Sequence, residues 1–312
     1  NNTMKLVFMG TPDFSVATVD AIYKASHEIT LVVTQPDKPR GRSGALSPSP
    51  VKEWALEHDI PVFQPERIKR PEAVAELKKY EADLFVVTAF GQILSQEILD
   101  MPRFGCINVH ASLLPKYRGA APIQWAVLNG DEVSGVTTMM MAAGIDDGDM
   151  LLKKEYKLAS DETGGSLFDK LAVMGGELIV ETIDKLSKGM ITPQPQDESE
   201  ATHVGMIKKE DGCIDFSNAA VVIERQIRGL NPWPSAYTKL DGKTLKLWSA
   251  KVVSGVNKGQ PGEVIAVDKT GFTVNCGLDS LYIMELQLEG KKRMKAGDFL
   301  RGYNLTEGVK LG

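Results

Sequence analysis

The chain has 312 residues, of which 43% are hydrophobic and 25% are charged, a composition typical of a globular protein long enough for about two domains. This composition excludes the disordered and fibrous classes, and no apolar run approaches the roughly 20 residues that a membrane-spanning helix needs. The net charge of −5 conceals an asymmetry, because from residue 208 onward 16 Lys and Arg stand against 12 Asp and Glu. A basic C-terminal part suits a polyanionic partner such as RNA. We expect a cytoplasmic protein that acts as a monomer.

The pattern of the first two hundred residues predicts an α/β domain over residues 4–189. Short apolar runs indicate strands at residues 5–9, 29–34, 84–89, 106–110 and 136–141. Amphipathic stretches indicate helices at residues 13–25, 51–59, 72–80, 121–129 and 165–187. Strands that alternate with helices in this way favour a Rossmann-like, doubly wound and mostly parallel sheet.

The pattern changes after residue 189. Residues 190–207 include a polar, proline-rich stretch at 192–197, which predicts a linker. In residues 208–312, short runs of period two are broken by glycines, and one helix is expected near 219–230. These features predict a small C-terminal β-barrel domain of the OB-like kind.

Polar side chains are expected to converge at the carboxyl end of the predicted strand 106–110. Ile107 and Val109 face one side of that strand, so Asn108 and His110 share the other side. Ligands bind at the carboxyl ends of the strands in such sheets. An amide donor and an imidazole suit acyl transfer, because the oxygen of an attacked carbonyl group gains negative charge. A histidine in a strand is more often structural, and the pair leaves both interpretations open.

An acidic loop, residues 144–149, directly follows the predicted strand 136–141. We expect this loop at the same edge of the sheet as His110, where one of its three carboxylates would favour the protonated imidazole. The spacing of its acids does not match a calcium-binding EF-hand, and a plain turn is the alternative. No nucleophile elbow of the G-x-S-x-G kind is present, so direct attack by a substrate amine on a bound acyl donor is favoured over covalent catalysis.

Three cysteines, Cys106, Cys213 and Cys276, lie far apart in the chain. Their spacing is not that of a metal site, and their odd number disfavours a disulfide framework. We expect buried thiols and no bound metal.

Residues 108–115, followed by residues 118–124, resemble the folate-dependent formyltransferase superfamily. Further matching stretches lie at residues 10–14, 34–37 and 228–234. The resemblance implies that Asn108, His110 and Asp146 form a catalytic trio. It also implies a site for 10-formyltetrahydrofolate made by Phe90, Gly91, Ser112, Leu113, Leu114 and Pro115.

Within the superfamily, the likeness is to the members that formylate methionine attached to initiator tRNA. It implies that the methionyl α-amine attacks the formyl carbon, while Asn108 and protonated His110 stabilise the oxyanion. Asp146 would orient and charge His110. The resemblance also implies that the loop of residues 37–44 grips the acceptor end of the tRNA, with Arg42 as the candidate contact. Lys209, just after the linker, is a second candidate, and the basic excess of residues 208–312 favours tRNA binding by the C-terminal domain. A formyltransferase acting on an aminosugar nucleotide and a non-catalytic RNA-binding protein are the alternatives.

Overall fold

The computed structural model describes residues 3–312, and these residues form two compact units. Unit 1 contains the residues up to Pro122 together with Val133–Lys157 and Phe168–Val204. Unit 2 contains Ile123–Glu132, Leu158–Leu167 and Gly205–Gly312. The units are therefore not consecutive segments of the chain, because two short internal segments group with the C-terminal residues.

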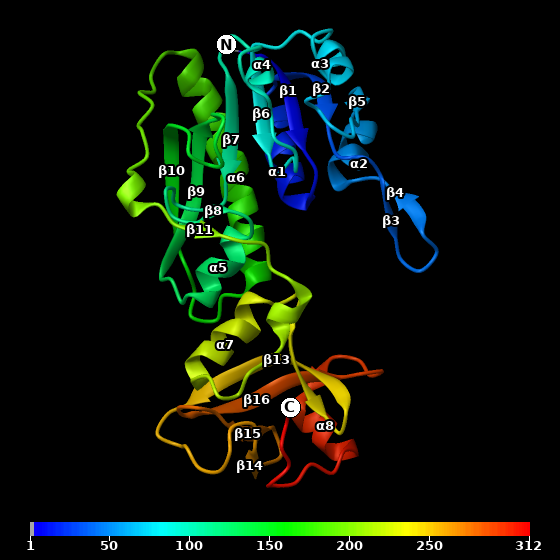
Figure 1. The fold of residues 1–312 in the computed structure, drawn as a ribbon, viewed down its shortest axis with the longest axis vertical. Helices are drawn as coiled ribbons and strands as arrows, with labels where there is room; N and C mark the ends of the chain where they lie inside the picture. Colours follow the sequence, from blue (N-terminus) through cyan, green and yellow to red (C-terminus); the bar gives the residue numbers. More distant parts are fainter. Residues whose placement is uncertain (1–2) are drawn as a thin grey trace. The chain divides into compact units, whose positions relative to one another are not determined.

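A seven-stranded sheet forms the centre of unit 1, in the order β10-β9-β7-β6-β1-β2-β5 (Figure 1). Its strands are β1 Lys5–Gly10, β2 Glu28–Val33, β5 Val62–Phe63, β6 Leu84–Thr88, β7 Cys106–His110, β9 Val133–Met140 and β10 Met150–Lys157. Strands β5, β2, β1, β6 and β7 pair in parallel, whereas β9 runs antiparallel to both β7 and β10. The arrangement confirms the predicted Rossmann-like, mostly parallel sheet.

Helices cover both faces of this sheet. They are α1 Asp13–Lys24, α2 Pro50–Glu57, α3 Pro71–Leu77, α4 Gln96–Leu99 and α6 Gly164–Ser187, of which the residues from Phe168 belong to unit 1. Phe85, Val87 and Cys106 pack in one core cluster with side chains of α3 and α4. On the other face α6 is close enough that a Cβ at Gly175 would lie 3.2 Å from Val109. The pleat of β7 therefore separates Val109 from Cys106, as the alternation of the sequence predicts.

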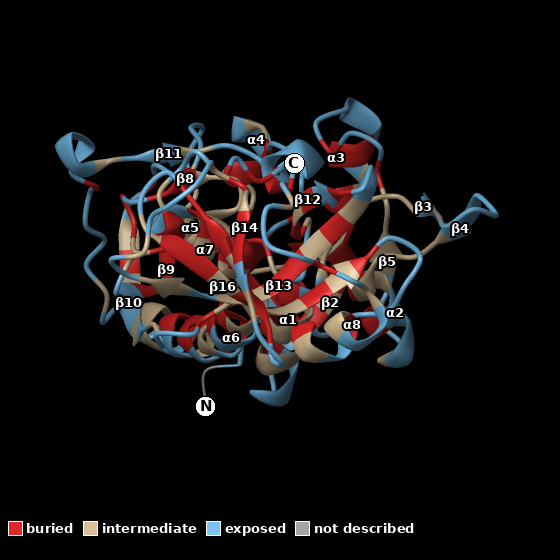
Figure 2. Cartoon of the chain, turned by 90° about the horizontal axis from the view of Figure 1, so that it is seen from below, coloured by how far each residue is buried: buried red, intermediate tan, exposed pale blue. Residues whose placement is uncertain are grey.

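The segment that precedes α2 is a β-hairpin formed by β3 Lys38–Arg40 and β4 Ala45–Ser47. It extends away from the sheet of unit 1 (Figure 1) and is largely exposed (Figure 2). Ser49 caps α2 by accepting a hydrogen bond from the Lys52 N–H at 3.1 Å. The expected loop at residues 37–44 is thus an ordered projection with a defined root.

The predicted linker is largely packed along unit 1. Met150 and Gln194 form an antiparallel bridge, a short 3-10 helix spans Glu198–Glu200, and β11 His203–Val204 pairs in parallel with β8 Arg118–Gly119. The segment is irregular, as its prolines predict, yet the backbone groups of Gln194, Thr202 and Val204 are hydrogen-bonded to other parts of unit 1. It is therefore part of the structure around the candidate site.

Unit 2 contains an antiparallel sheet in the order β12-β13-β16-β15-β14, with β17 paired to β16. Its strands are β12 Ala236–Leu240, β13 Lys243–Val253, β14 Val264–Val267, β15 Phe272–Asn275, β16 Ser280–Leu288 and β17 Met294–Lys295. Helix α7 Ala220–Gly229 and helix α8 Ala296–Gly302 bury Ile223, Ile227 and Phe299 in the core of this unit. Helix α5 Pro122–Leu128 lies almost wholly within the first of the two short segments of unit 2. The antiparallel C-terminal domain is as predicted, and closure of its sheet into a barrel stays a prediction.

Across the described part of the chain, no helix combines the length and the apolar character that crossing a bilayer requires.

Candidate active site

Asn108 and His110 lie on β7, between β6 and β9. Asn108 is opposite Val87 and Met139, and His110, the last residue of the strand, is opposite Thr137. His110 is 8% exposed, whereas Asn108 is half-buried. Among residues 3–312, no hydrogen bond is made by the side-chain amide of Asn108. The strand therefore presents an amide that is free to donate and, two residues on, an imidazole on the same face.

The two ring nitrogens of His110 have different partners. Nε2 lies 2.8 Å from the carbonyl oxygen of Tyr117, and Nδ1 lies 3.7 Å from Asp146 Oδ2. A carbonyl oxygen only accepts, so Nε2 carries a hydrogen and Nδ1 is the nitrogen that faces the carboxylate. At 3.7 Å this separation is too long for a hydrogen bond, and it becomes an ion pair when the imidazole carries a second proton.

Asp146 reaches His110 by a route that the sequence did not indicate. Because β9 is antiparallel to β7, Met140 at the end of β9 pairs with Ile107 near the beginning of β7. The expectation that the loop 144–149 begins at the carboxyl edge of β7 is therefore wrong. The loop folds back along β7 instead, and the Gly119 N–H donates to Asp146 Oδ2 at 2.8 Å. The trio comes together through this return path.

The loop after β7 is tied down by hydrogen bonds. Thr137 Oγ1 donates to the Ser112 carbonyl oxygen at 2.7 Å and accepts from the Leu114 N–H at 3.1 Å. The Ser112 hydroxyl donates to the Lys116 carbonyl oxygen at 2.6 Å, and the Leu114–Pro115 peptide bond is cis. Ser112, Leu114 and Pro115 are buried, so among the four predicted folate contacts of this loop only the Leu113 side chain is partly exposed.

The loop that follows β6 lies beside the carboxyl end of β7 and is held by polar side chains. Thr11 donates to the Phe90 carbonyl oxygen at 2.9 Å, and Gln35 Nε2 donates to the Gly91 carbonyl oxygen at 3.0 Å. Gly91 has a φ of 93°, and a Cβ there would lie 2.7 Å from Gln35 Nε2. Only glycine suits this position. Phe90 itself is buried, so the loop offers its backbone rather than its aromatic ring.

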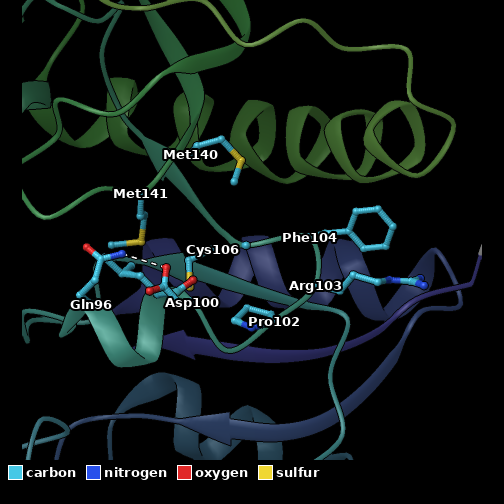
Figure 3. A pocket seen from close by; sticks show the side chains of 10 residues that line it. Gln96, Asp100, Pro102, Arg103, Phe104, Cys106, Met140 and Met141 are labelled. Carbon is cyan, nitrogen blue, oxygen red and sulfur yellow. Dashed lines mark hydrogen bonds between the residues drawn. The ribbon is translucent and has the colours of Figure 1, made fainter.

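A cavity of about 520 Å³ opens near the beginning of β7, between α4 and the end of β9 (Figure 3). Cys106, Met140 and Met141 contribute sulfur-bearing side chains to its lining. Cys106, which lines this cavity, lies about 13 Å from His110, because the two residues are four positions apart along β7. Burial raises the pKa of the Cys106 thiol to about 12, so this cysteine is not a thiolate nucleophile.

Comparison with known proteins identifies the family. The family described as Formyl transferase matches residues 4–183, and the one described as Formyl transferase, C-terminal domain, matches residues 206–304. This chain belongs to the formyl transferase family. The predicted superfamily is thereby confirmed.

Some known proteins resemble this chain in sequence over its whole length, and others resemble it in fold alone. A methionyl-tRNA formyltransferase of Agathobacter rectalis is 58% identical over 98% of this chain and 98% of its own. One from Lachnospira eligens is 56% identical over 99% and 100%. Among solved structures, the sugar 3N-formyl transferase WlaRD aligns with a TM-score of 0.65 at 18% identity, over 94% of this chain and 100% of that one. HypX from Aquifex aeolicus in complex with tetrahydrofolic acid aligns with a TM-score of 0.63 at 18% identity. The alignment spans 99% of this formyltransferase chain but only 50% of the HypX chain.

The two predicted tRNA contacts of this formyltransferase lie in different units. Arg42 is exposed between β3 and β4 in unit 1, and Lys209 is exposed in a short 3-10 helix of unit 2. The root of the hairpin is fixed at Asp37, which accepts hydrogen bonds from Gln64 at 2.7 Å and from Lys52 at 3.1 Å. These two partners hold the pKa of the Asp37 carboxyl below its ordinary value, with Gln64 the larger cause.

Two residues around the trio were not singled out from the sequence. Arg118 is 3% exposed and Gln196 is 8% exposed, and they hydrogen-bond to each other beside the loop of Asp146. Arg118 carried a weak signal, since it begins the matching stretch 118–124. Gln196 carried none, because it lies among the prolines of the predicted linker.

The thiols only partly follow expectation. Cys106 and Cys276 are buried, as predicted, but Cys213 is exposed. Cys213 follows a short 3-10 helix at the beginning of unit 2, where an isolated bridge to Tyr237 orders the backbone without covering the side chain.

Proposed function

We propose that this protein transfers the formyl group of 10-formyltetrahydrofolate to the α-amino group of methionyl initiator tRNA, for translation initiation. The observation that carries the proposal is the trio of Asn108, His110 and Asp146 in a chain 58% identical, over nearly its whole length, to a methionyl-tRNA formyltransferase. Sugar formyltransferases share the fold at 18% identity. The aminosugar nucleotide is therefore the weaker candidate acceptor.

The reaction begins when the neutral α-amine attacks the formyl carbon, and the formyl oxygen then takes on negative charge. The Asn108 amide and a proton on His110 Nδ1 can both donate to that oxygen, because Nε2 is occupied by the Tyr117 carbonyl. One such donor is typically worth about 3 kcal/mol of transition-state stabilisation. The pair therefore supplies the electrostatic part of the catalysis.

Proton balance assigns a second role to Asp146. The attacking nitrogen must lose one proton, and N10 of the folate must gain one as the carbon–nitrogen bond breaks. Asp146 Oδ2 is held by the Gly119 N–H, which leaves the other oxygen of the carboxylate to accept the proton of the amine, directly or through water. The products are the formylated amine and tetrahydrofolate.

The folate site is proposed for the loops that end β6 and β7. Within residues 112–115 the serine hydroxyl and the Leu114 side chain are engaged inside unit 1. We therefore assign folate contact in that loop to the Leu113 side chain and to the backbone, with further backbone contact from Phe90 and Gly91.

The tRNA is proposed to contact Arg42 on the hairpin and Lys209 in unit 2. Both side chains are exposed and basic, which suits phosphate contact. We assign the catalytic domain to residues 4–189, the linker between the domains to residues 190–207, and the tRNA-binding domain to residues 208–312. The expected form is a cytoplasmic monomer, for which gel filtration would give a mass near 34.0 kDa.

The test supplies purified protein with 10-formyltetrahydrofolate and either methionyl initiator tRNA or an aminosugar nucleotide, and measures the formylated product. Transfer to the tRNA, lost in His110→Ala, is the expected result. A sugar product without a tRNA product would overturn the proposed acceptor. Binding of tRNA without transfer to either acceptor would instead identify a non-catalytic RNA-binding protein.

The hairpin can be tested separately. Arg42→Ala is expected to raise KM for the tRNA while leaving the Kd of the folate unchanged, because the side chain is exposed on a hairpin that extends away from the sheet. Arg67→Ala removes the same charge from another exposed position of unit 1 and serves as the control. Equal loss of folate and tRNA binding in Arg42→Ala would refute this role.

A further inference from the structure

Gln196 joins the predicted linker to the loop that carries Asp146. Its Nε2 donates to the carbonyl oxygens of Asp146 and Gly148, each at 2.8 Å. Its Oε1 accepts from Arg118 Nε at 3.0 Å and from a second nitrogen of the same guanidinium at 2.9 Å. Both donors and both lone pairs of this amide are thus used in a buried setting. Such saturation fixes the orientation of the side chain.

Arg118 is fixed from its other side by Glu198. Two nitrogens of the guanidinium donate to the two carboxylate oxygens at 2.8 and 2.7 Å, which is the bidentate geometry. This hydrogen bonding lowers the pKa of the Glu198 carboxyl. Arg118 also precedes Gly119, whose N–H holds Asp146 Oδ2. Arg118 is therefore connected to both groups that hold Asp146. It hydrogen-bonds to the amide of Gln196, and it is the residue next to Gly119 in the chain.

The loop needs such support because the sheet does not provide it. The loop leaves and re-enters the sheet at Met140 and Asp149, whose N–H and carbonyl oxygen are hydrogen-bonded at 2.8 Å. Between them, Ile145 is 66% exposed and Asp146 has a φ of 52°, in the left-handed region. Among the described residues, the hydrogen bonds that tie Asp146 to other segments come from Gly119 and Gln196.

The second support depends on the linker as well. Strand β11 pairs with β8, and Ala120 donates to the Val204 carbonyl oxygen at 3.1 Å. A Cβ at Gly119 would lie 2.4 Å from that same oxygen, so the backbone there is held closely against the linker. Residues 194–204 thus hold both groups that orient Asp146.

We propose that Gln196 and Arg118 are positioning residues, and that the linker segment 194–204 acts through them as a latch that holds Asp146 against His110. The proposal rests on the proposed function for its kinetic consequences but not for its structural ones. Neither side chain needs to contact a substrate. Their loss should lower kcat and leave the binding of both substrates in place.

The test compares Gln196→Met, Gln196→Glu and a matched control, Gln226→Met. Gln226 in unit 2 also donates through Nε2 to two backbone carbonyl oxygens, those of Asp211 at 2.9 Å and Cys213 at 3.3 Å. We expect Gln196→Met to lower kcat by about 10²-fold, the usual cost of misplacing a reacting group by about 1 Å. KM for both substrates should stay within about twofold, and Gln226→Met should keep the parent's kcat.

Gln196→Glu separates positioning from simple packing. It keeps the acceptor for Arg118 but sets a carboxylate oxygen against the carbonyl oxygens of Asp146 and Gly148. Protonation of the new carboxyl restores one donor, so the activity of this variant relative to the parent should rise as the pH falls. A ratio that does not change with pH would overturn the proposal.

Hydrogen exchange gives a readout that needs no catalysis. The amides of residues 144–149 should exchange at least about tenfold faster in Gln196→Met than in the parent, with no such change in Gln226→Met. Unchanged exchange, or a loss of kcat in Gln226→Met equal to that in Gln196→Met, would overturn the latch.

If the parent itself formylates no tRNA, the proposed function fails while the exchange experiment still decides the latch. If Gln196→Met does not fold, Arg118→Lys is measured in its place, because one ammonium group cannot bridge Gln196 and Glu198 as the guanidinium does.

Discussion

Replacing Asp146 by asparagine would remove one negative charge, and with it the proposed proton acceptor, while leaving the geometry of the site in place. Asp146 Oδ2 accepts from the Gly119 N–H at 2.8 Å and lies 3.7 Å from His110 Nδ1. Only the oxygen of an asparagine amide can accept from that N–H, so it would take the same place and keep the same distance to His110. The left-handed φ of 52° is also one that asparagine adopts readily.

The part of the loss that comes from the charge can be worked out from the distance between the two side chains. The side chains of His110 and Asp146 are 9% and 18% exposed. For unit charges at this separation and an effective dielectric constant of about 20, Coulomb's law gives an interaction of about 4 kcal/mol as an upper value. Each 1.36 kcal/mol or so corresponds to a factor of about ten in rate. Asp146→Asn should therefore lower kcat/KM by up to about 1,000-fold at neutral pH.

The assay measures initial rates of formylmethionyl-tRNA formation, together with the Kd of the folate. Asp147→Asn is the matched control, since it removes the same charge from an exposed neighbour in the same loop. We expect the control to keep nearly full activity and Asp146→Asn to bind folate normally. A loss of less than about tenfold in Asp146→Asn, or an equal loss in Asp147→Asn, would refute the electrostatic role of this carboxylate.

Three further outcomes are expected. Asn108→Ala should lower kcat/KM by about 10²–10³-fold through loss of one oxyanion donor, with an unchanged Kd for folate; a rate near that of the parent would show that the amide does not contact the oxyanion. In the folded protein at pH 8 only Cys213 should react with a thiol reagent, because Cys106 and Cys276 are buried, with pKa values raised to about 12; a second fast thiol would contradict this. The depressed pKa of Asp37 contributes stability above its ordinary value of 3.8 that is lost as the pH falls through the lower folded value. Asp37→Asn should thus unfold at a lower urea concentration than the parent at pH 7. If this difference persists undiminished below pH 3, the ionisation of Asp37 is not what stabilises the parent.

Several features of the site could be predicted from the sequence because they depend on local periodicity. Residues 106–110 form a buried strand, and the period of two in a strand places Asn108 and His110 on one face whatever the rest of the chain does. The same local patterns predicted the helices that the structure shows as α2 and α3, and the glycine-broken strands of unit 2. The family resemblance added the third member of the trio.

The path to Asp146 could not be predicted, because it depends on strand direction. The apolar run of residues 136–141 reads alike in a parallel and an antiparallel strand, and only pairing with β7 decides between them. The antiparallel pairing starts the loop near Ile107, and the loop reaches His110 by folding back. Asp146 and His110 are therefore close together, as inferred from the sequence, but the return path of the loop brings them together rather than a shared edge of the sheet.

Gln196 is the clearest case of a residue that only the tertiary structure could assign. It lies 78 residues from Arg118 and 50 from Asp146 in the chain, within a stretch whose composition predicts an unstructured linker. Composition indicates whether a segment can form regular secondary structure. The segment around Gln196 forms only a short 3-10 helix and a two-residue strand. Whether its polar groups are satisfied by water or by the catalytic loop is decided by hydrogen bonds between distant segments, which no local pattern encodes.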